Sequence, residues 1–221
     1  MGQKNKLPKS AVVGIVDSAE AWRLAARLRP GTLDALEWRA DCLPDAAAIP
    51  ASKFPWILTV RDPREGGRGA LSTGERQKLF LRLLPGAAFV DVELRSLRAM
   101  RRVREEAAAH RIRLIASFHD FHGTSFTPAR GREMSLRAAD AGADIFKIAT
   151  RTATPRDIAR LLGLFSSPPL PLAVMGMGPL GFSSRLLFAA CGSVLNYGWL
   201  HRANAPGQWA ALELKKMLER R

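Results

Sequence analysis

Short apolar or alternating segments recur along the chain, and each is followed by a turn signal and a stretch with helical periodicity. The strand-like segments lie near residues 11–16, 34–41, 56–61, 88–94, 113–119, 144–150, 170–177 and 193–198. Helical periodicity predicts helices over residues 18–28, 74–84, 96–110, 128–141, 155–165, 182–191 and 206–220. Only the connection from 42 to 55 lacks a convincing helical pattern. The chain is therefore expected to alternate regularly between strands and helices.

Eight such alternations in a chain of 221 residues favour an α/β fold, the parallel (β/α)₈ TIM barrel, as a single domain. We place the barrel at residues 11–221, after a basic N-terminal tail at residues 1–10. An open, doubly wound sheet is the alternative. Residues 13–17, Val-Gly-Ile-Val-Asp, speak against it because they lack the several glycines of a dinucleotide-binding loop. Barrels bind ligands at the C-terminal ends of their strands, so polar residues there become candidates.

Charged side chains share one face of the second strand-like segment. Glu37, Arg39 and Asp41 alternate with apolar residues, which predicts that the charges point into the barrel. They could hold a polar ligand or form an internal ion-pair network, and this segment alone leaves both open. Arg61 ends the third segment, and the glycine-containing stretch after it is expected to be a mobile loop that can carry Glu65 over the barrel mouth.

Lys147 lies in the middle of the apolar run 143–150. A lone lysine of this kind more often reaches solvent from a strand end, because a buried ammonium is costly. Other segments place polar side chains on the face that Lys147 shares, including Asp91 with Glu93 and, in the fifth segment, His119 at the height of a catalytic residue. The combination favours a functional lysine, for which we expect apolar walls and nearby arginines.

The C-terminal third adds candidates for ligand binding. Arg185 follows a glycine-containing turn close to a predicted helix start, a natural place for a carboxylate. Residues 204–208, Asn-Ala-Pro-Gly-Gln, have the composition of a lid with Gln208 at its tip, although an ordinary turn before a helix is the alternative. Met177 could line an apolar wall or fill the core.

Composition narrows the class of protein. The chain is 47% hydrophobic, yet no apolar run reaches the roughly 20 residues of a membrane helix, and the N-terminus lacks the apolar core of a secretion signal. The two cysteines, Cys42 and Cys191, are isolated, which argues against a disulfide framework or a metal site and fits a reducing compartment.

The net charge of +14 raises the question of nucleic-acid binding. The basic residues are scattered through predicted helices, and no zinc-finger spacing or aromatic RNA-binding motif accompanies them. We therefore expect solvated helix faces, with no membrane partner and no nucleic-acid partner.

These segments together resemble the type I 3-dehydroquinate dehydratases, the Schiff-base-forming dehydroquinases of the shikimate pathway. The resemblance is carried by residues 37–41 (Glu-Trp-Arg-Ala-Asp), 59–61 with 65–67, 117–121, 146–149, 175–177, 184–185 and 205–208. Each motif alone is weak, but their order and spacing are specific. The main departure is Asn204, where this family commonly has serine; asparagine can still donate a hydrogen bond.

The resemblance implies a catalytic set of Lys147, His119 and Glu65. Lys147 would attack the ring ketone of 3-dehydroquinate to give an imine, and His119 would remove a proton and then help the tertiary hydroxyl leave as water. Glu65 would orient His119 and stabilise its cationic form. The product would be 3-dehydroshikimate.

The resemblance also implies the binding residues and the biological setting. The expected substrate-binding residues are Glu37, Arg39, Arg61, Met177, Arg185, Asn204 and Gln208. No cofactor or metal is implied, and a cytoplasmic homodimer serving aromatic amino acid biosynthesis is expected. The alternatives are another Schiff-base barrel enzyme of the aldolase kind and, further off, a noncatalytic basic protein that binds nucleic acid.

Overall fold

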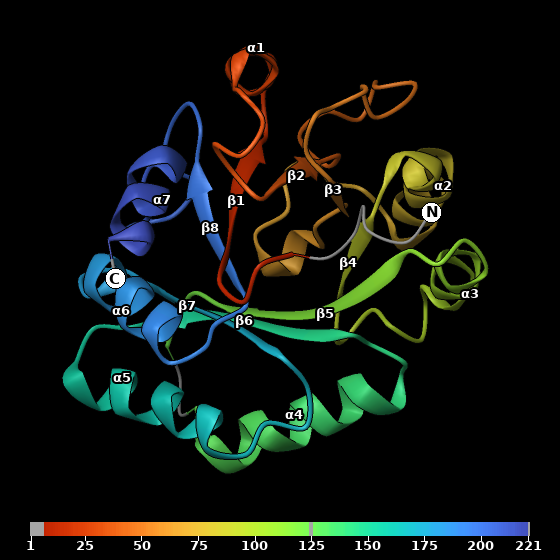
Figure 1. Ribbon diagram of the computed structural model, residues 1–221. Helices are drawn as coiled ribbons and strands as arrows, with labels where there is room; N and C mark the ends of the chain where they lie inside the picture. The colour runs from red at the N-terminus through yellow and green to blue at the C-terminus, as the bar shows by residue number, and fades with distance from the viewer. Residues whose placement is uncertain (1–6, 124–125, 221) are drawn as a thin grey trace.

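The structure, a computed structural model, describes residues 7–123 and 126–220 and is a nearly closed barrel of parallel strands with helices around it (Figure 1). The strands are β1 (Ala11–Val16), β2 (Ala35–Arg39), β3 (Trp56–Thr59), β4 (Phe89–Glu93), β5 (Arg113–Asp120), β6 (Ile145–Arg151), β7 (Leu172–Met177) and β8 (Leu195–Trp199). The α-helices are α1 (Ala19–Arg27), α2 (Thr73–Leu83), α3 (Arg101–Ala109), α4 (Pro128–Asp140), α5 (Pro155–Leu162), α6 (Gly181–Ala190) and α7 (Ala211–Glu219). Three short 3₁₀ helices are η1 (Pro63–Glu65), η2 (Leu84–Gly86) and η3 (Gly163–Ser166). The prediction of a single-domain (β/α)₈ barrel is confirmed.

Most strands pair with their sequence neighbours, and β1 also pairs with β8. The exception is the junction between β7 and β8, here called the seam, where the described residues form no strand ladder. One backbone bond, from Val194 N to Leu172 O at 2.8 Å, crosses it. The hydroxyl of Ser193 adds a second link, since it accepts from Val174 N at 2.9 Å and donates to Leu195 O at 3.2 Å. Side chains therefore take the place of missing backbone hydrogen bonds there.

Apolar side chains form two separate cores. The outer core lies between strands and helices and contains Trp38, Phe80 and Phe146. The inner core fills the barrel interior toward the N-terminal ends of the strands and includes Val13 and Ile57. Each large side chain that is buried in this way contributes about 1.5–3 kcal/mol to folding. Because apolar groups fill the barrel interior toward the N-terminal ends of the strands, the polar side chains gather at the C-terminal ends.

The described part of the predicted basic tail packs against the barrel. Leu7 is half-buried against the inner core, and the Ser10 hydroxyl accepts a 2.9 Å hydrogen bond from Asn196 of β8. Residues 1–6 lie outside the described residues. The described end of the proposed tail therefore contacts the barrel near the N-terminal ends of its strands.

Two helices begin later than their sequence patterns predict. Helix α3 begins at Arg101 instead of residue 96, because Ser96 is buried and hydrogen-bonded to Arg76 and Asp62. Helix α7 begins at Ala211 instead of residue 206, because Gly207 packs against the start of α6. Residues 42–55, all of them described, form turns and no helix, as expected.

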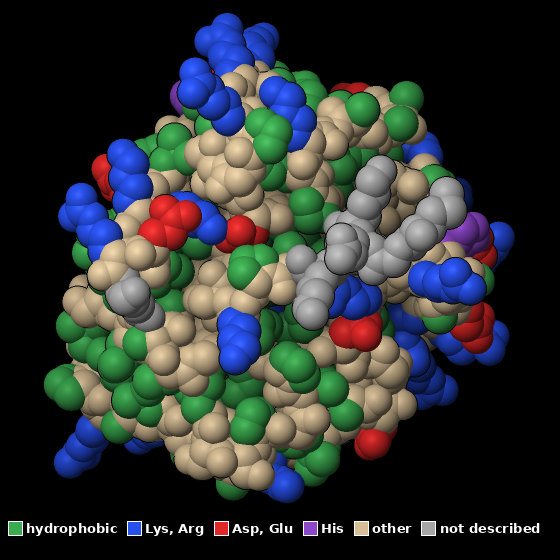
Figure 2. Space-filling model, in the orientation of Figure 1, with side chains coloured by type: hydrophobic (Ala, Val, Ile, Leu, Met, Phe, Trp, Pro, Cys, Tyr) green, Lys and Arg blue, Asp and Glu red, His purple; other side chains and the backbone are tan. Residues whose placement is uncertain are grey.

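The distribution of basic side chains on the surface agrees with the scattered charge that the sequence predicted. In Figure 2 the Lys and Arg side chains lie in separate groups, most of them around the edge of the face shown and a few nearer its middle. Within residues 7–123 and 126–220, no helix has both the length and the apolar character needed to cross a membrane.

Candidate active site

A cavity of about 260 Å³ opens at the C-terminal end of the barrel strands. Every predicted site residue lines it: Glu37, Arg39, Arg61, Glu65, His119, Lys147, Met177, Arg185, Asn204 and Gln208. These residues come from six strands or the loops beyond them and from helix α6. The parallel strands bring together side chains that are far apart in the sequence.

The Lys147 amine is buried at the floor of this cavity. Its Nζ lies 2.8 Å from Asp91 Oδ2 and 3.5 Å from Glu37 Oε1. The ring of Tyr197 faces it, with Nζ 4.1 Å from the ring centroid. Tyr197 supplies the expected apolar wall, and Arg61 is near, since it binds the same Asp91 carboxylate, but the closest charged contacts of the amine are carboxylates.

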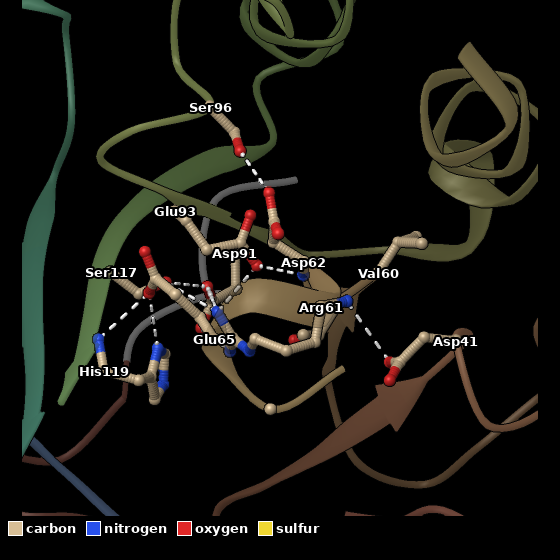
Figure 3. A network of polar contacts seen from close by, with 12 residues as sticks. Asp41, Val60, Arg61, Asp62, Glu65, Asp91, Glu93, Ser96, Ser117 and His119 are labelled. Atoms are coloured by element: carbon tan, nitrogen blue, oxygen red, sulfur yellow. Dashed lines mark hydrogen bonds and ion pairs between the residues drawn. The ribbon is translucent and has the colours of Figure 1, made fainter. Parts of the chain in front are cut away.

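Arg61 organises a network of carboxylates (Figure 3). Its guanidinium donates to Asp91 at 3.1 and 3.2 Å, to Glu93 at 3.0 Å and to the Ser117 hydroxyl at 2.7 Å. Burial alone would raise the pKa of Asp91, yet the charges of Arg61 and Lys147 hold that pKa well below its usual range. Asp91 therefore remains an anion that two cations share.

The internal ion-pair network expected as one possibility is present, and its members include a residue that faces the cavity. Glu37 accepts a 2.8 Å hydrogen bond from Thr59 and lies 3.9 Å from Arg61, so it belongs to the internal network. It also lines the cavity. The network holds ligand-facing groups in place, which is what preorganisation of a site requires.

His119 and Glu65 form a pair at the cavity wall (Figure 3). Glu65 Oε2 lies 3.0 Å from the backbone N of His119 and 3.1 Å from its Nδ1. An ionised carboxylate only accepts hydrogen bonds, so it selects the tautomer with hydrogen on Nδ1 and leaves Nε2 free to take a proton. Burial, reinforced by the charges of Arg61 and Lys147, lowers the pKa of His119 well below its ordinary value. A neutral imidazole of this kind is suited to act as a base.

Glu65 itself lies in a short helical turn and is buried. It lies in η1, which Gly66 ends in a left-handed conformation with φ of 85°. Gly67 comes so close to the backbone that an added Cβ would lie 2.1 Å from Arg61 O, which explains the two consecutive glycines. The stretch after Arg61 thus begins with a helical turn that buries Glu65, and its mobility stays a prediction. Burial and the nearby Glu93 carboxylate raise the pKa of Glu65 to about 7.

Arg185 lies in the second turn of α6, one turn later than expected, and reaches across the seam. Its Nε donates to Gly176 O on β7 at 3.1 Å and its Nη1 to Tyr197 O on β8 at 2.9 Å. No carboxylate of the described residues lies within ion-pair distance, and burial lowers its pKa to about 10. A buried guanidinium without a counter-ion, at the wall of a cavity, is a site for an anionic group of a ligand.

Residues 200–210, here called the lid loop, close over the cavity between β8 and α7. Gln208 is buried instead of sitting at an exposed tip, and its Oε1 accepts from Asn204 N at 2.8 Å. Gly178 N donates to Pro206 O at 2.9 Å, which ties the loop to the start of α6. Met177 is buried at the end of β7 and contributes an apolar wall.

Arg39 is held by Asp41, just beyond β2. Two hydrogen bonds of 2.9 and 2.7 Å join the guanidinium to the carboxylate. A third, longer bond of 3.4 Å reaches Gly66 O beside Glu65. The pair therefore links β2 to the turn that carries Glu65.

Tyr197 and Phe121 line the cavity but were not identified from the sequence, because nothing in an aromatic residue at a strand end marks it as functional. Asp91, which alternation placed with Glu93 on the interior face, contacts the lysine directly. No cluster of three or more His, Cys, Asp or Glu suited to a metal ion occurs in the described part of the chain.

Comparisons with known proteins agree with this geometry. The family model described as Type I 3-dehydroquinase matches residues 11–221. A 3-dehydroquinate dehydratase of Thermococcus gammatolerans is 33% identical over 210 residues, covering 94% of this chain and 97% of that protein. The crystal structure of 3-dehydroquinate dehydratase from Geobacillus kaustophilus aligns with a TM-score of 0.83 at 26% identity, over 95% of this chain and 90% of that one. The corresponding Aquifex aeolicus structure gives 0.75 at 28% identity, over 95% and 98%. The chain belongs to the type I 3-dehydroquinase family.

Proposed function

We propose that this chain is a hydro-lyase that removes water from 3-dehydroquinate through a Schiff base on Lys147. The observation that carries the proposal is the juxtaposition in one cavity of a buried lysine, a histidine kept neutral by burial, and an arginine without a counter-ion. A lysine supplies the nucleophile, a neutral histidine the base, and the arginine a place for the substrate carboxylate.

The first step forms the imine. The Lys147 amine adds to the ring ketone, and loss of the carbonyl oxygen as water gives a protonated imine. Asp91, 2.8 Å from Nζ, supplies a fixed negative charge beside the cation that forms. Such preorganised charge stabilises a developing cation more than mobile water does.

The second step removes the elements of water from the ring. His119 takes a proton from the carbon next to the imine, and the protonated imine accepts the electron pair. The resulting imidazolium gives its proton to the tertiary hydroxyl, which leaves as water. Glu65 stabilises the imidazolium from Nδ1. A second water then hydrolyses the imine and releases 3-dehydroshikimate together with the free lysine.

Binding and orientation come from the rest of the cavity wall. Arg185 is the proposed partner of the carboxylate, together with Gln208. Glu37, Arg39 and Arg61 are the proposed partners of the ring hydroxyls, while Asn204 and Met177 complete the enclosure. Holding a small polyol at several points places the reacting carbon beside His119.

Borohydride reduction in the presence of 3-dehydroquinate tests the covalent step. Reduction should trap the imine as a stable adduct on the Lys147 peptide, detected by mass mapping, and Lys147→Ala should abolish it. Lys215→Ala is the matched control, because Lys215 also pairs with a carboxylate, Asp34 at 2.9 Å, but lies outside the cavity. An unlabelled Lys147 peptide in an enzyme that is turning over would contradict the mechanism. His119→Ala should still form the adduct while elimination, followed by the ultraviolet absorbance of the enone, slows.

We also propose a cytoplasmic homodimer that acts in the shikimate pathway. Family resemblance supports this assembly, and α6 and α7 expose the apolar side chains Phe182, Leu187, Leu212 and Met217. Light scattering should give twice the mass of the 24.2 kDa chain. A mass of one chain at working concentration would contradict the dimer.

A further inference from the structure

Arg76 reaches from α2 into the network of charges behind the cavity. It is buried, with 1% of its surface exposed, and it does not line the cavity itself. Its Nε and Nη2 donate to Val60 O at 3.0 and 2.9 Å, and its Nη1 donates to Asp62 Oδ2 at 3.1 Å. Nη2 also donates to Glu93 Oε2. Arg76 therefore holds the residues on both sides of Arg61 and a carboxylate that Arg61 shares.

Glu93, which lies beside Arg61 in Figure 3, has a separate arginine for each carboxylate oxygen. Its Oε1 accepts from Arg61 Nη1 at 3.0 Å, and its Oε2 accepts from Arg76. Glu93 therefore does not hold Arg61 with both oxygens, and the Arg61 guanidinium also donates to Asp91 at 3.1 and 3.2 Å. Asp91 in turn lies 2.8 Å from Lys147 Nζ. An unbroken series of contacts thus joins α2 to the amine that the proposed reaction uses.

Arg76 also balances the buried charges around Arg61. Three buried carboxylates lie within ion-pair distance of Arg61: Glu37, Asp91 and Glu93. Lys147 pairs with the first two of them, and Arg76 pairs with the third. Because a buried charge that loses its partner is costly, Glu93 would turn toward Arg61 if Arg76 were absent.

The charge of Glu93 also acts on Glu65. Burial is the main cause of the raised pKa of Glu65, and the Glu93 carboxylate is the next. The charges of Arg61 and of Arg95, just beyond β4, and the backbone N–H of His119 oppose this rise in pKa. A cation that pairs with Glu93 weakens its field at Glu65, because opposite charges side by side largely cancel at a distance.

We propose that Arg76 is a positioning residue, which takes up one oxygen of Glu93 and thereby fixes the geometry and the charge of the site from behind. Its geometric effect is on the orientation of Arg61, which lines the cavity. Its electrostatic effect is on Glu65, which it shields from the Glu93 charge. The inference rests on the proposed function, in which Arg61 binds the substrate and ionised Glu65 stabilises the His119 imidazolium.

Two substitutions of Arg76 separate these effects. Ionised Glu65 is required in the proposed mechanism, so kcat for 3-dehydroquinate should rise with pH as Glu65 loses its proton. Arg76→Met removes the charge and the fork of donors, so the midpoint of this rise should move up by roughly one pH unit while KM rises roughly tenfold. Arg76→Lys keeps the charge but not the planar fork, so the midpoint should stay at its wild-type value and KM should rise roughly threefold.

A second background tests whether the effect on KM passes through Glu93. In Glu93→Gln, no anion remains at this position to turn toward Arg61. Adding Arg76→Met in this background should therefore raise KM less than about twofold. A rise of about tenfold here as well would show that Arg76 does not act through Glu93.

The controls separate this inference from the proposed function. Lys78→Met removes one charge from an exposed position of the same helix and should change neither the midpoint nor KM. Borohydride trapping on Lys147 is measured in every variant and should persist in all of them. If Arg76→Met keeps its wild-type midpoint or its wild-type KM, the role of Arg76 is refuted. If that variant does not fold, a shifted midpoint or an unchanged KM in Arg76→Lys refutes it. A wild type without turnover or adduct would refute the proposed function instead.

Discussion

Replacing Glu65 with glutamine removes a charge and keeps the shape of the side chain. Glu65 is buried, with 4% of its surface exposed, and one oxygen meets both the backbone N–H and Nδ1 of His119. The glutamine oxygen can still accept these bonds, so the tautomer of His119 is preserved. What is lost is the anion that, in the proposed mechanism, stabilises the imidazolium during elimination.

The cost to catalysis follows from that interaction. A hydrogen bond to a charged group is worth about 1.5–3 kcal/mol, which corresponds to roughly a 10- to 150-fold loss in kcat. Burial raises the pKa of Glu65 to about 7, so only above that pH is the wild-type group mainly ionised. We therefore expect the wild-type kcat to rise between about pH 6 and pH 8, and Glu65→Gln to lack this rise.

The effect on stability has the opposite sign. Because the folded-state pKa of Glu65 lies at about 7, above its ordinary value of 4.5, the folded protein holds this proton more tightly than the unfolded chain does. Ionised Glu65 therefore destabilises the fold progressively as pH rises from 4.5 to 7, by about 3 kcal/mol once pH exceeds 7. Glutamine avoids this cost, so the variant should be more stable at pH 8 and gain nothing at pH 4.

Two measurements check the reasoning. Enone absorbance gives kcat between pH 5.5 and 9, and urea unfolding at pH 4 and pH 8 gives the free energy of unfolding. Glu20→Gln is the matched control, because Glu20 pairs with Arg23 on an exposed face of α1. A variant that keeps the wild-type pH profile, or that is less stable than the wild type at pH 8, would show that Glu65 does not play this role.

Three further substitutions probe other parts of the site. Asp91→Asn leaves the buried Arg61 and Lys147 short of one carboxylate, so the free energy of unfolding should fall by about 3–5 kcal/mol; an unchanged urea midpoint would contradict this. Arg185→Gln removes the guanidinium without a counter-ion, and KM for 3-dehydroquinate should rise roughly 10- to 150-fold, whereas an unaltered KM would remove Arg185 from carboxylate binding. Gly67→Ala places a Cβ 2.1 Å from Arg61 O and must move the turn that carries Glu65, so kcat should drop at least tenfold, while Gly74→Ala, where no atom lies within 4 Å, should leave kcat unchanged.

The sequence predicted the barrel well because strand and helix periodicities are local. Alternation placed Glu37 and Lys147 on the interior face, and the structure brings Lys147 Nζ and Glu37 Oε1 to 3.5 Å although the residues are far apart in the chain. The later starts of α3 and α7 escaped prediction, because each depends on a contact with a distant segment. Helix propensity carries no information about such contacts.

The charged contacts within the site were harder to predict from the sequence than the identity of the residues that line it. Periodicity gives the face on which Lys147 lies, but not which charges of that face approach it most closely, so the contacts with Asp91 and Glu37 were not predicted. The helical turn that holds Glu65 was hidden for a similar reason, since the glycines next to it indicate an open loop until the close approach to Arg61 O is known.

Arg185 spans the seam by binding a carbonyl on each side of it, Gly176 O on β7 and Tyr197 O on β8. The side chain proposed to bind the anionic group of the ligand therefore also joins the two strands of the barrel wall. A substitution of Arg185 that let the site accept an uncharged compound would also remove the two hydrogen bonds that join β7 and β8 across the seam. Selection for a stable fold should therefore preserve Arg185 whatever the ligand. We expect new ligand specificities to arise first in the lid loop.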